Sequence, residues 1–147
     1  MATNAETNRE SATDARTVIE RHIEAFNARR PDEDPWATEA QMVAPGAEIS
    51  GREGVLGFMG VFQEAFPDGR LSVWRYVVDG TDVAVEGRFT GRHDGILRGP
   101  AGDVPPTGRQ ADFRWAAAYE TSGDELLSEH LYFDQVELLG QLGLLPA

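Results

Sequence analysis

The hydrophobic period of this chain changes at about residue 70, and the change limits the folds that it can adopt. Before that point apolar side chains recur every three to four residues, as on one face of an α-helix. After it they alternate with polar side chains, as on half-buried β-strands. Helices followed by a run of antiparallel strands indicate an α+β domain.

The pattern predicts where most of these elements begin and end. Thr13 or Asp14 can cap the first helix. That helix should end near Arg30, because Pro31 disfavours helical backbone in the residue before it. Further helices are expected at 52–66 and 135–142, and strands at 71–78, 83–92, 110–119 and 126–133. Loops are expected at 31–46, with one short helix around 36–41, and at 94–108.

The second helix contains three glycines that lower its intrinsic helix propensity, Gly54, Gly57 and Gly60. Their spacing puts them along one flank of the helix. We therefore expect this flank to pack closely against another element.

Length and composition narrow the classes of protein. The 147 residues predict one domain at 13–147 behind a polar, disordered tail at 1–12. The chain has no cysteine and no lysine, which excludes disulfides, thiol catalysis and imine formation through lysine. A formal net charge of -12 argues against nucleic acid or an anionic membrane as partner. Because no apolar run reaches the ~20 residues of a membrane span and no signal peptide is apparent, we expect a cytoplasmic protein.

Two parts of the chain carry distinctive motifs. The first is Gly91-Arg92-His93-Asp94-Gly95, followed by Pro105-Pro106-Thr107-Gly108-Arg109. The second is Tyr132-Phe133-Asp134, followed by Leu138-Leu139-Gly140-Gln141-Leu142-Gly143. In order and spacing these motifs resemble the SnoaL-like polyketide cyclases, from about Thr17 onward. The resemblance implies a nuclear transport factor 2-like fold, in which a strongly bent antiparallel or mixed sheet wraps around N-terminal helices as a cone.

The same resemblance implies a function. It suggests a cofactor-free cyclase that closes a ring of an aromatic polyketide by an intramolecular aldol reaction, as in antibiotic biosynthesis and other secondary metabolism. In such cyclases the Asp at the position of Asp134 is the catalytic acid/base. Asp134 ends an apolar strand, where desolvation would raise its pKa and suit it to proton transfer. Asp is also a preferred helix N-cap, and a helix is predicted directly after it, so both interpretations stay open.

Neighbouring residues extend this candidate site. His130, Tyr132 and Asp134 share one strand face, so His130 is a second catalytic candidate and Tyr132 a substrate-binding one. The family's pocket His, expected one strand earlier, has no counterpart here; Tyr119, Glu120 or His130 could replace it.

His93 has two interpretations. It either contacts substrate at the rim of the pocket or is bonded to the backbone of its loop. The glycines on either side of it allow special backbone conformations at the strand end.

Large aromatic residues are candidates for the walls of a pocket. Trp115 lies in the middle of its strand and is the first candidate to stack on a planar polycyclic ligand. The further substrate-binding candidates are Tyr119, Phe89, Trp74, Phe26 and Phe62. Three dispersed histidines lack the spacing of metal ligands, so we expect no metal.

Two alternatives to a cyclase stay open: a related enzyme (hydroxylation-associated, isomerase or epoxide hydrolase) or a non-catalytic small-molecule-binding module. An epoxide hydrolase needs two carboxylates and an Arg around one water, but Asp112 and Arg114 are expected to face away from the pocket. A buried carboxyl with a raised pKa would favour an enzyme over a binding module. Small and charged residues on the outer sheet face are compatible with a homodimer or homotetramer.

Overall fold

The computed structural model describes the backbone of residues 4–146 and the side chains of residues 15–146. Within these residues, six strands form a mixed sheet in the order β2-β1-β8-β7-β4-β3, and two short strands form a separate hairpin, β5-β6. The strands are β1 (Trp36–Ala44), β2 (Ala47–Ser50), β3 (Arg70–Asp79), β4 (Asp82–Arg92), β5 (Leu97–Gly99), β6 (Gly102–Val104), β7 (Gln110–Ser122) and β8 (Glu125–Phe133). The helices are α1 (Asn4–Ala28), the single 3-10 turn η1 (Pro31–Glu33), α2 (Arg52–Ala65) and α3 (Gln135–Gln141).

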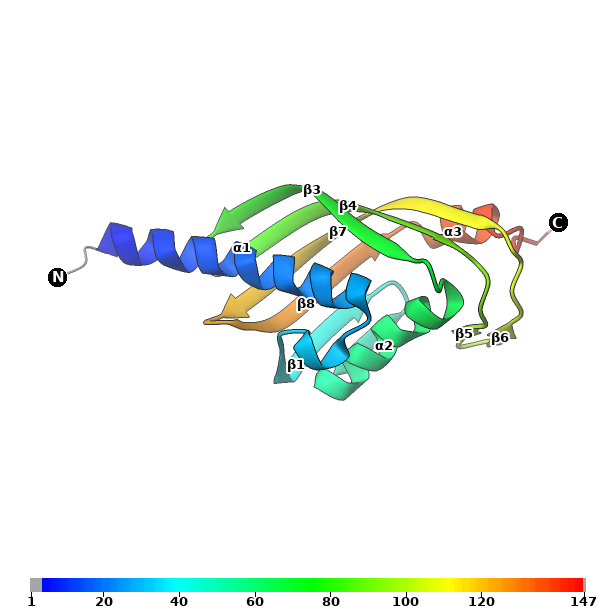
Figure 1. The fold of residues 1–147 in the computed structure, drawn as a ribbon, viewed down its shortest axis with the longest axis horizontal. Coiled ribbons are helices and arrows are strands. Elements are labelled where there is room, and N and C mark those ends of the chain that lie inside the picture. The colour runs from blue at the N-terminus through cyan, green and yellow to red at the C-terminus, as the bar shows by residue number, and fades with distance from the viewer. Residues whose placement is uncertain (1–3, 147) are drawn as a thin grey trace.

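The sheet is long and curved, and two helices lie against one of its faces (Figure 1). β1 and β8 run parallel, whereas the pairs β1–β2, β8–β7, β7–β4 and β4–β3 are antiparallel. α1 packs on β3, β4, β7 and β8, and α2 packs on β1, β2 and β5. The core fills the space between these helices and the sheet.

Alternation along the strands explains why one face is covered. In β7 every second residue is buried, from Ala111 through Phe113 and Trp115 to Thr121, and the residues between them are more exposed. β4 shows the same alternation, starting at Val83. Asp112 and Arg114 are exposed on the other face, as expected. The four strands predicted after residue 70 are confirmed as β3, β4, β7 and β8.

The structure differs from the sequence prediction between residues 31 and 46. The expected loop with a short helix at 36–41 is wrong, because Trp36–Ala44 forms β1. Trp36, Ala40 and Met42 are buried, and the strand pairs with β8, so its conformation is set by a partner far along the chain. The predicted loop at 94–108 likewise contains the β5-β6 hairpin.

The N-terminal segment also differs from its prediction. The backbone from Asn4 is part of α1, although a disordered tail was predicted over 1–12. Residues 1–3 of that predicted tail lie outside the described residues. No helix in the described part of the chain is long and apolar enough to cross a membrane.

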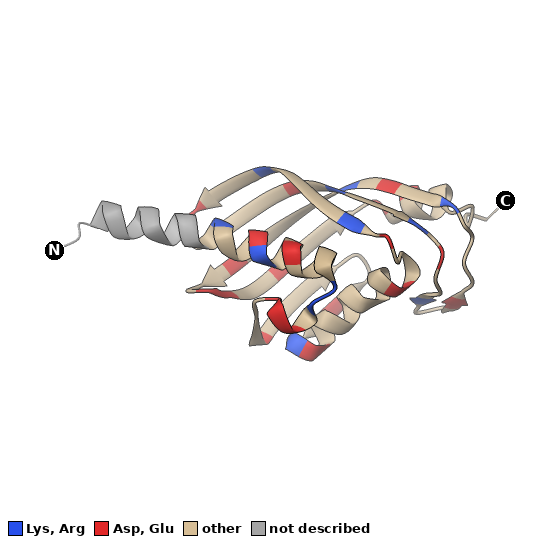
Figure 2. Ribbon diagram, viewed as in Figure 1, with Lys and Arg blue, Asp and Glu red and all other residues tan. Residues whose placement is uncertain are grey.

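Charged residues are spread over the helices and strands rather than gathered in one patch (Figure 2). The blue residues of Figure 2 are all arginines, because the chain has no lysine. Several of them pair with acids across the outer sheet face, such as Arg75 with Glu86 and Arg88 with Asp112. Such exposed pairs contribute little to stability, ~0–1 kcal/mol each, so the buried groups matter more.

Candidate functional site

A narrow cavity lies between the covered face of the sheet and the helices α1 and α2. About 50 Å³ of it is open to the centre of a water-sized sphere, which is room for a few water molecules. Its walls are mostly aromatic and aliphatic: Phe26, Phe58, Met59, Phe62, Leu71, Phe89, Phe113, Trp115, Leu131 and Phe133. Its polar lining residues are His22, Tyr119 and Glu129.

Glu129 is the acid of this cavity, and its side chain is almost inaccessible to solvent at 2% exposure. It lies on β8 opposite Tyr119 of β7, whose hydroxyl donates a hydrogen bond to Oε2 at 3.2 Å. The other oxygen, Oε1, accepts no hydrogen bond from the residues that the structure describes. Oε1 is therefore the oxygen available to a ligand.

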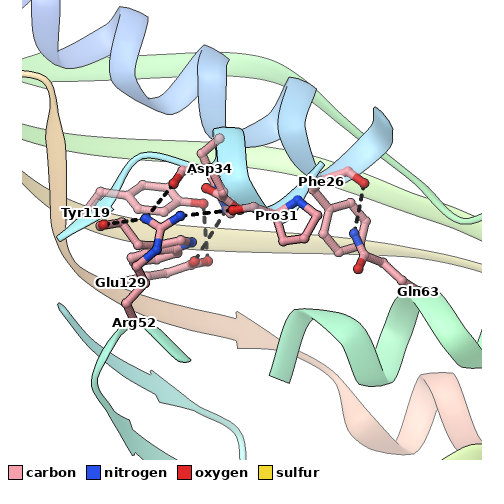
Figure 3. A network of polar contacts seen from close by, with 9 residues as sticks. Phe26, Pro31, Asp34, Arg52, Gln63, Tyr119 and Glu129 are labelled. Carbon is pink, nitrogen blue, oxygen red and sulfur yellow. Dashed lines mark hydrogen bonds and ion pairs between the residues drawn. The ribbon is translucent and has the colours of Figure 1, made fainter. Parts of the chain in front are cut away.

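His22 of α1 lies across from this carboxyl group. Its Nε2 is 3.8 Å from Oε1 of Glu129, and its Nδ1 is 2.8 Å from Oδ1 of Asp34. Because a carboxylate only accepts, Nδ1 carries the hydrogen and donates it to Asp34. The rings of Trp36 and Tyr119 pack edge-on against the imidazole, with centroids 5.1 Å and 6.0 Å away. Figure 3 shows Asp34, Tyr119 and Glu129 gathered at this point from separate elements.

Burial and neighbouring charges tune these groups. Burial raises the pKa of Glu129 to about 7, although the nearby His22 charge and the Tyr119 hydrogen bond act to lower it. Burial alone would lower the pKa of His22, but the charge and hydrogen bond of Asp34 and the charge of Glu129 leave it raised. Burial, then Glu129, holds the pKa of Tyr119 well above its usual value, so Tyr119 remains a donor. A carboxyl with a pKa near neutrality can both take and return a proton.

Five of the predicted substrate-binding residues do line this cavity: Phe26, Phe62, Phe89, Trp115 and Tyr119. Trp115 reaches its place because Gly87 faces it on β4; a Cβ at residue 87 would come within 2.6 Å of the indole ring. The indole Nε1 is buried and has no hydrogen-bond partner among the described residues. Trp115 thus offers a free donor as well as a flat wall.

The other predicted residues of β8 lie on the opposite face of the sheet. His130 and Asp134 are exposed, and Tyr132 is 61% exposed. The expectation that Asp134 is desolvated in a pocket is wrong. Its carboxylate instead accepts hydrogen bonds from the N–H groups of Val136 and Glu137, at 2.9 and 3.1 Å, as the N-cap of α3. The shared face of residues 130, 132 and 134 is therefore real, but it is the outer one.

Trp74 also lies outside the cavity, on the face of β3 opposite to Leu71 and Val73. The register with β4 shifts between Val73 and Arg75, which leaves Trp74 as the extra residue and 55% exposed. Its expected place in the pocket wall is wrong.

His93 is buried behind the strand end rather than at the rim of the cavity. Its Nδ1 lies 2.9 Å from the Thr107 hydroxyl and accepts a hydrogen bond from the Thr107 backbone N–H at 3.2 Å. Burial lowers its pKa, against the opposing effects of Asp94 and of a backbone hydrogen bond at Gly95. Of the two interpretations of His93, these contacts support the one in which it is bonded to the backbone of its own loop.

The sequence analysis missed Glu129, His22 and Asp34 as site residues. A signal was present for Glu129, which shares its strand phase with Leu131 and Phe133. His22 lies among the buried apolar residues of α1, beside Ile19 and Phe26, where a polar ring needs a partner. Asp34 gave no comparable signal, because it lies among other acids and prolines of a short turn.

The described residues contain no cluster of three or more His, Asp or Glu side chains arranged to hold a metal ion.

Known proteins of the SnoaL-like kind resemble this chain in structure. The chain superimposes on a proposed SnoaL-like polyketide cyclase from Jannaschia sp. CCS1 with a TM-score of 0.81, at 20% identity over 92% of this chain and 96% of the other. It matches AclR, a proposed hydroxylase from Streptomyces galilaeus, with a TM-score of 0.78, at 21% identity over 93% and 89% of the two chains. It also matches IdmH, a proposed polyketide cyclase from Streptomyces antibioticus, with a TM-score of 0.73, at 26% identity over 88% and 98%.

A search of curated proteins gave no match. The fold is the α+β cone of the nuclear transport factor 2-like and ketosteroid isomerase-like proteins, as the sequence motifs implied. A model of the family described as SnoaL-like polyketide cyclase matches residues 16–142, which is most of the sequence and includes Glu129 and His22. The chain therefore belongs to the SnoaL-like polyketide cyclase family.

Proposed function

We propose that this chain is a cofactor-independent cyclase that closes a ring of an aromatic polyketide intermediate, with Glu129 as its acid/base. The observation that carries the proposal is the setting of this one carboxyl group. It is buried in an aromatic cavity, with Oε2 held by Tyr119 and Oε1 unpartnered among the described residues. Membership of the family supports the class of substrate, and the acid/base role moves from Asp134 to Glu129.

The reaction is an internal aldol addition. A C–H between two carbonyl groups is acidic enough for a carboxylate, and Oε1 of Glu129 takes its proton. The electron pair left behind forms an enolate, whose carbon attacks a second carbonyl carbon of the same molecule and closes the ring. The second carbonyl oxygen becomes an alkoxide and receives the proton back from Glu129. No atom is gained or lost, and Glu129 ends in its starting state.

Other residues of the cavity stabilise the charges that form. His22, held by Asp34, faces Oε1 at 3.8 Å, and its protonated form stabilises the carboxylate form of Glu129. The unpartnered Nε1–H of Trp115 can donate to a substrate carbonyl oxygen that becomes negative in the enolate. The aromatic walls hold the two reacting carbons in one pose, and good orientation contributes on the order of 7–11 kcal/mol to lowering such a barrier.

The same carboxyl group favours an enzyme over a non-catalytic binding module. A binder needs apolar walls, but it gains nothing from an acid whose pKa is raised to about 7 by burial. For an epoxide hydrolase the chain offers less support, because Asp112 and Arg114 are exposed on the outer face of the sheet.

Ring closure of an anthraquinone methyl ester with a β-keto side chain, followed by chromatography and absorbance, tests the proposal. We expect Glu129→Gln to lower kcat by about 100-fold or more, because the acid/base is lost while the side-chain volume stays. Asp134→Asn is the matched control and should keep full turnover, since Asn caps a helix as well as Asp does.

Each alternative has its own outcome in this assay. Loss of turnover in Asp134→Asn with full turnover in Glu129→Gln would return the role to Asp134 and refute the proposal. A wild type that binds the ester tightly and leaves it unchanged would support the binding module.

A further inference from the structure

Arg52, the first residue of α2, donates hydrogen bonds to three backbone carbonyl groups, two in the turn that precedes β1 and one at the first residue of β1. Its Nη1 donates to the oxygens of Asp34 and Trp36 at 2.8 and 2.7 Å, and its Nη2 donates to Pro31 at 3.0 Å (Figure 3). A planar guanidinium with donors in a rigid fork suits such an arrangement, whereas a lysine offers one flexible point of contact.

The turn that Arg52 holds carries Asp34 and has few other anchors. Residues 31–33 are exposed, and Asp34 is the first side chain after them that points into the protein. The backbone hydrogen bonds within the turn are Glu33 N–H to Arg30 at 3.0 Å, Asp34 N–H to Pro31 at 3.3 Å and Trp36 N–H to Asp34 at 2.9 Å. Leu126 N–H of β8 donates to Pro35 at 2.7 Å. Arg52 thus supplies three of the hydrogen bonds that join this turn to another element.

We propose that Arg52 is a positioning residue, which holds the Asp34 carboxylate against His22 and thereby fixes the charge that faces Glu129. The role for Glu129 rests on the proposed function, but the placement of Asp34 against His22 does not. Arg52 touches neither the cavity lining nor the carboxyl group of Glu129; it acts through the turn.

The same helix also forms a wall of the cavity. Phe58, Met59 and Phe62 of α2 line it. Arg52 thus links the wall that a ligand contacts to the acid/base groups at the polar end. A movement of α2 on ligand binding would be transmitted to Asp34 through one side chain.

The titration of His22 reports whether Asp34 is in place. The titratable groups that face this imidazole are Asp34 from the turn, Glu129 from β8 and Tyr119 from β7. The chain has only two other histidines, the buried His93 and the exposed His130, so ring ¹⁵N spectra are simple to assign. His130 serves as an internal reference.

Arg52→Met is the test variant, and Gln63→Leu is its matched control. Gln63 also ties α2 to a backbone carbonyl, that of Phe26 at 3.0 Å, without touching the turn. We expect Arg52→Met to lower the midpoint of the His22 titration by about one pH unit or more, because a carboxylate at 2.8 Å is released. Arg52→Lys should give a smaller shift in the same direction, and Gln63→Leu should leave the midpoint unchanged.

A His22 midpoint unchanged in Arg52→Met, together with a shift in Asp34→Asn, would overturn the role of Arg52. If Arg52→Met does not fold, an unchanged midpoint in Arg52→Lys overturns it equally. An equal shift in Gln63→Leu would also overturn it, because loosening α2 by any route would then be sufficient. Failure of the proposed function looks different: Glu129→Gln would keep its turnover while the His22 shift in the Arg52 variants stands.

Discussion

Glu129 and His130 are joined by one peptide bond, yet the first side chain is 2% exposed and the second lies in solvent. The difference follows from strand geometry, because successive side chains point to opposite faces. The consequence for Glu129 is energetic. A carboxylate that has lost its water must be compensated by Tyr119 and His22, and burial outweighs that compensation and raises its pKa to about 7.

Stability should therefore fall as pH rises, more steeply in the wild type than in Glu129→Gln. The pKa of Glu129 is about 7 in the folded chain and near the ordinary 4.5 when unfolded, so the folded state binds the proton more tightly. Its contribution is complete below pH 4.5 and is lost as pH rises through 7. The loss is up to ~3 kcal/mol, at ~1.4 kcal/mol for each pH unit. His22, whose pKa is also raised, acts in the same direction.

Urea unfolding of both proteins at pH 5 and pH 8 measures this difference. Comparing the two proteins cancels the contribution of the other acids of this strongly acidic chain. Parallel pH profiles would contradict the burial of an ionisable group at this position.

For single residues, the sequence predicts the apolar lining of the cavity better than its polar lining. Phe89, Trp115 and Tyr119 could be placed in the cavity because alternation along β4 and β7 is regular. Both faces of β8 contain apolar residues, so alternation alone does not show which face lines the cavity. The family motif led us to predict the face of Asp134. Glu129 meets His22 and Asp34 only after distant elements pack, which no local pattern describes.

Among the elements, the loop that follows β4 lies very close to the C-terminal end of α2. Gly95 donates its N–H to Ala65 at 3.1 Å, and a Cβ there would overlap the carbonyl oxygen of Glu64, at 1.8 Å. A Cβ at Gly91 would lie 3.0 Å from Phe66, the residue that follows α2. The glycines around His93 are thus explained by close packing on the C-terminal end of α2.

Two glycine substitutions in this region should have opposite effects. Gly95→Ala forces backbone apart and should lower the free energy of unfolding by ~3 kcal/mol. Gly57→Ala, in the exposed middle of α2, should raise it by ~0.5–1 kcal/mol, because a Cβ there meets no atom of the described residues within 4 Å. Thermal unfolding of both variants measures the contrast. Destabilisation by Gly57→Ala would show that this flank is packed after all.

The predicted close packing along the glycine flank of α2 holds for Gly54, whose Cβ would lie 3.0 Å from Ile49, and not for Gly57 or Gly60. Strand β1, which the sequence did not predict, likewise depends on a contact with a distant part of the chain. A segment such as Trp36–Ala44 becomes a strand because β8 offers a free edge beside it. Strands with adjacent hairpin partners, such as β3 and β4, could be predicted from sequence because their pairing is local.

The whole molecule leaves the outer face of its sheet uncovered by α1 and α2 (Figure 1). Trp74, Val77 and Tyr132 are 55%, 50% and 61% exposed there, around the small Ala84 and Ala118. The overall α+β architecture was predictable from the change in hydrophobic period, and the outer position of Asp112 and Arg114 from strand phase. Which large apolar groups lie on this outer face was not predicted, because both phases of β3 and β8 contain apolar residues.

We expect two copies of the chain to pair through this face. Light scattering should then give a mass above the 16.1 kDa of one chain, and Val77→Glu should return it to that value by placing a charge in the interface. Val136→Glu is the control, because Val136 is also exposed, at 63%, but lies on α3. A wild type that is already monomeric would refute the expectation.

The narrowness of the cavity has a consequence for the speed of binding. With room for only a few water molecules, it can admit a multi-ring compound only after side chains of its wall move aside. The rate of complex formation is then limited by how often the cavity opens and not by how often a ligand arrives. As the concentration of ligand grows, the observed rate should level off at a ceiling that belongs to the protein and is the same for every ligand that fits.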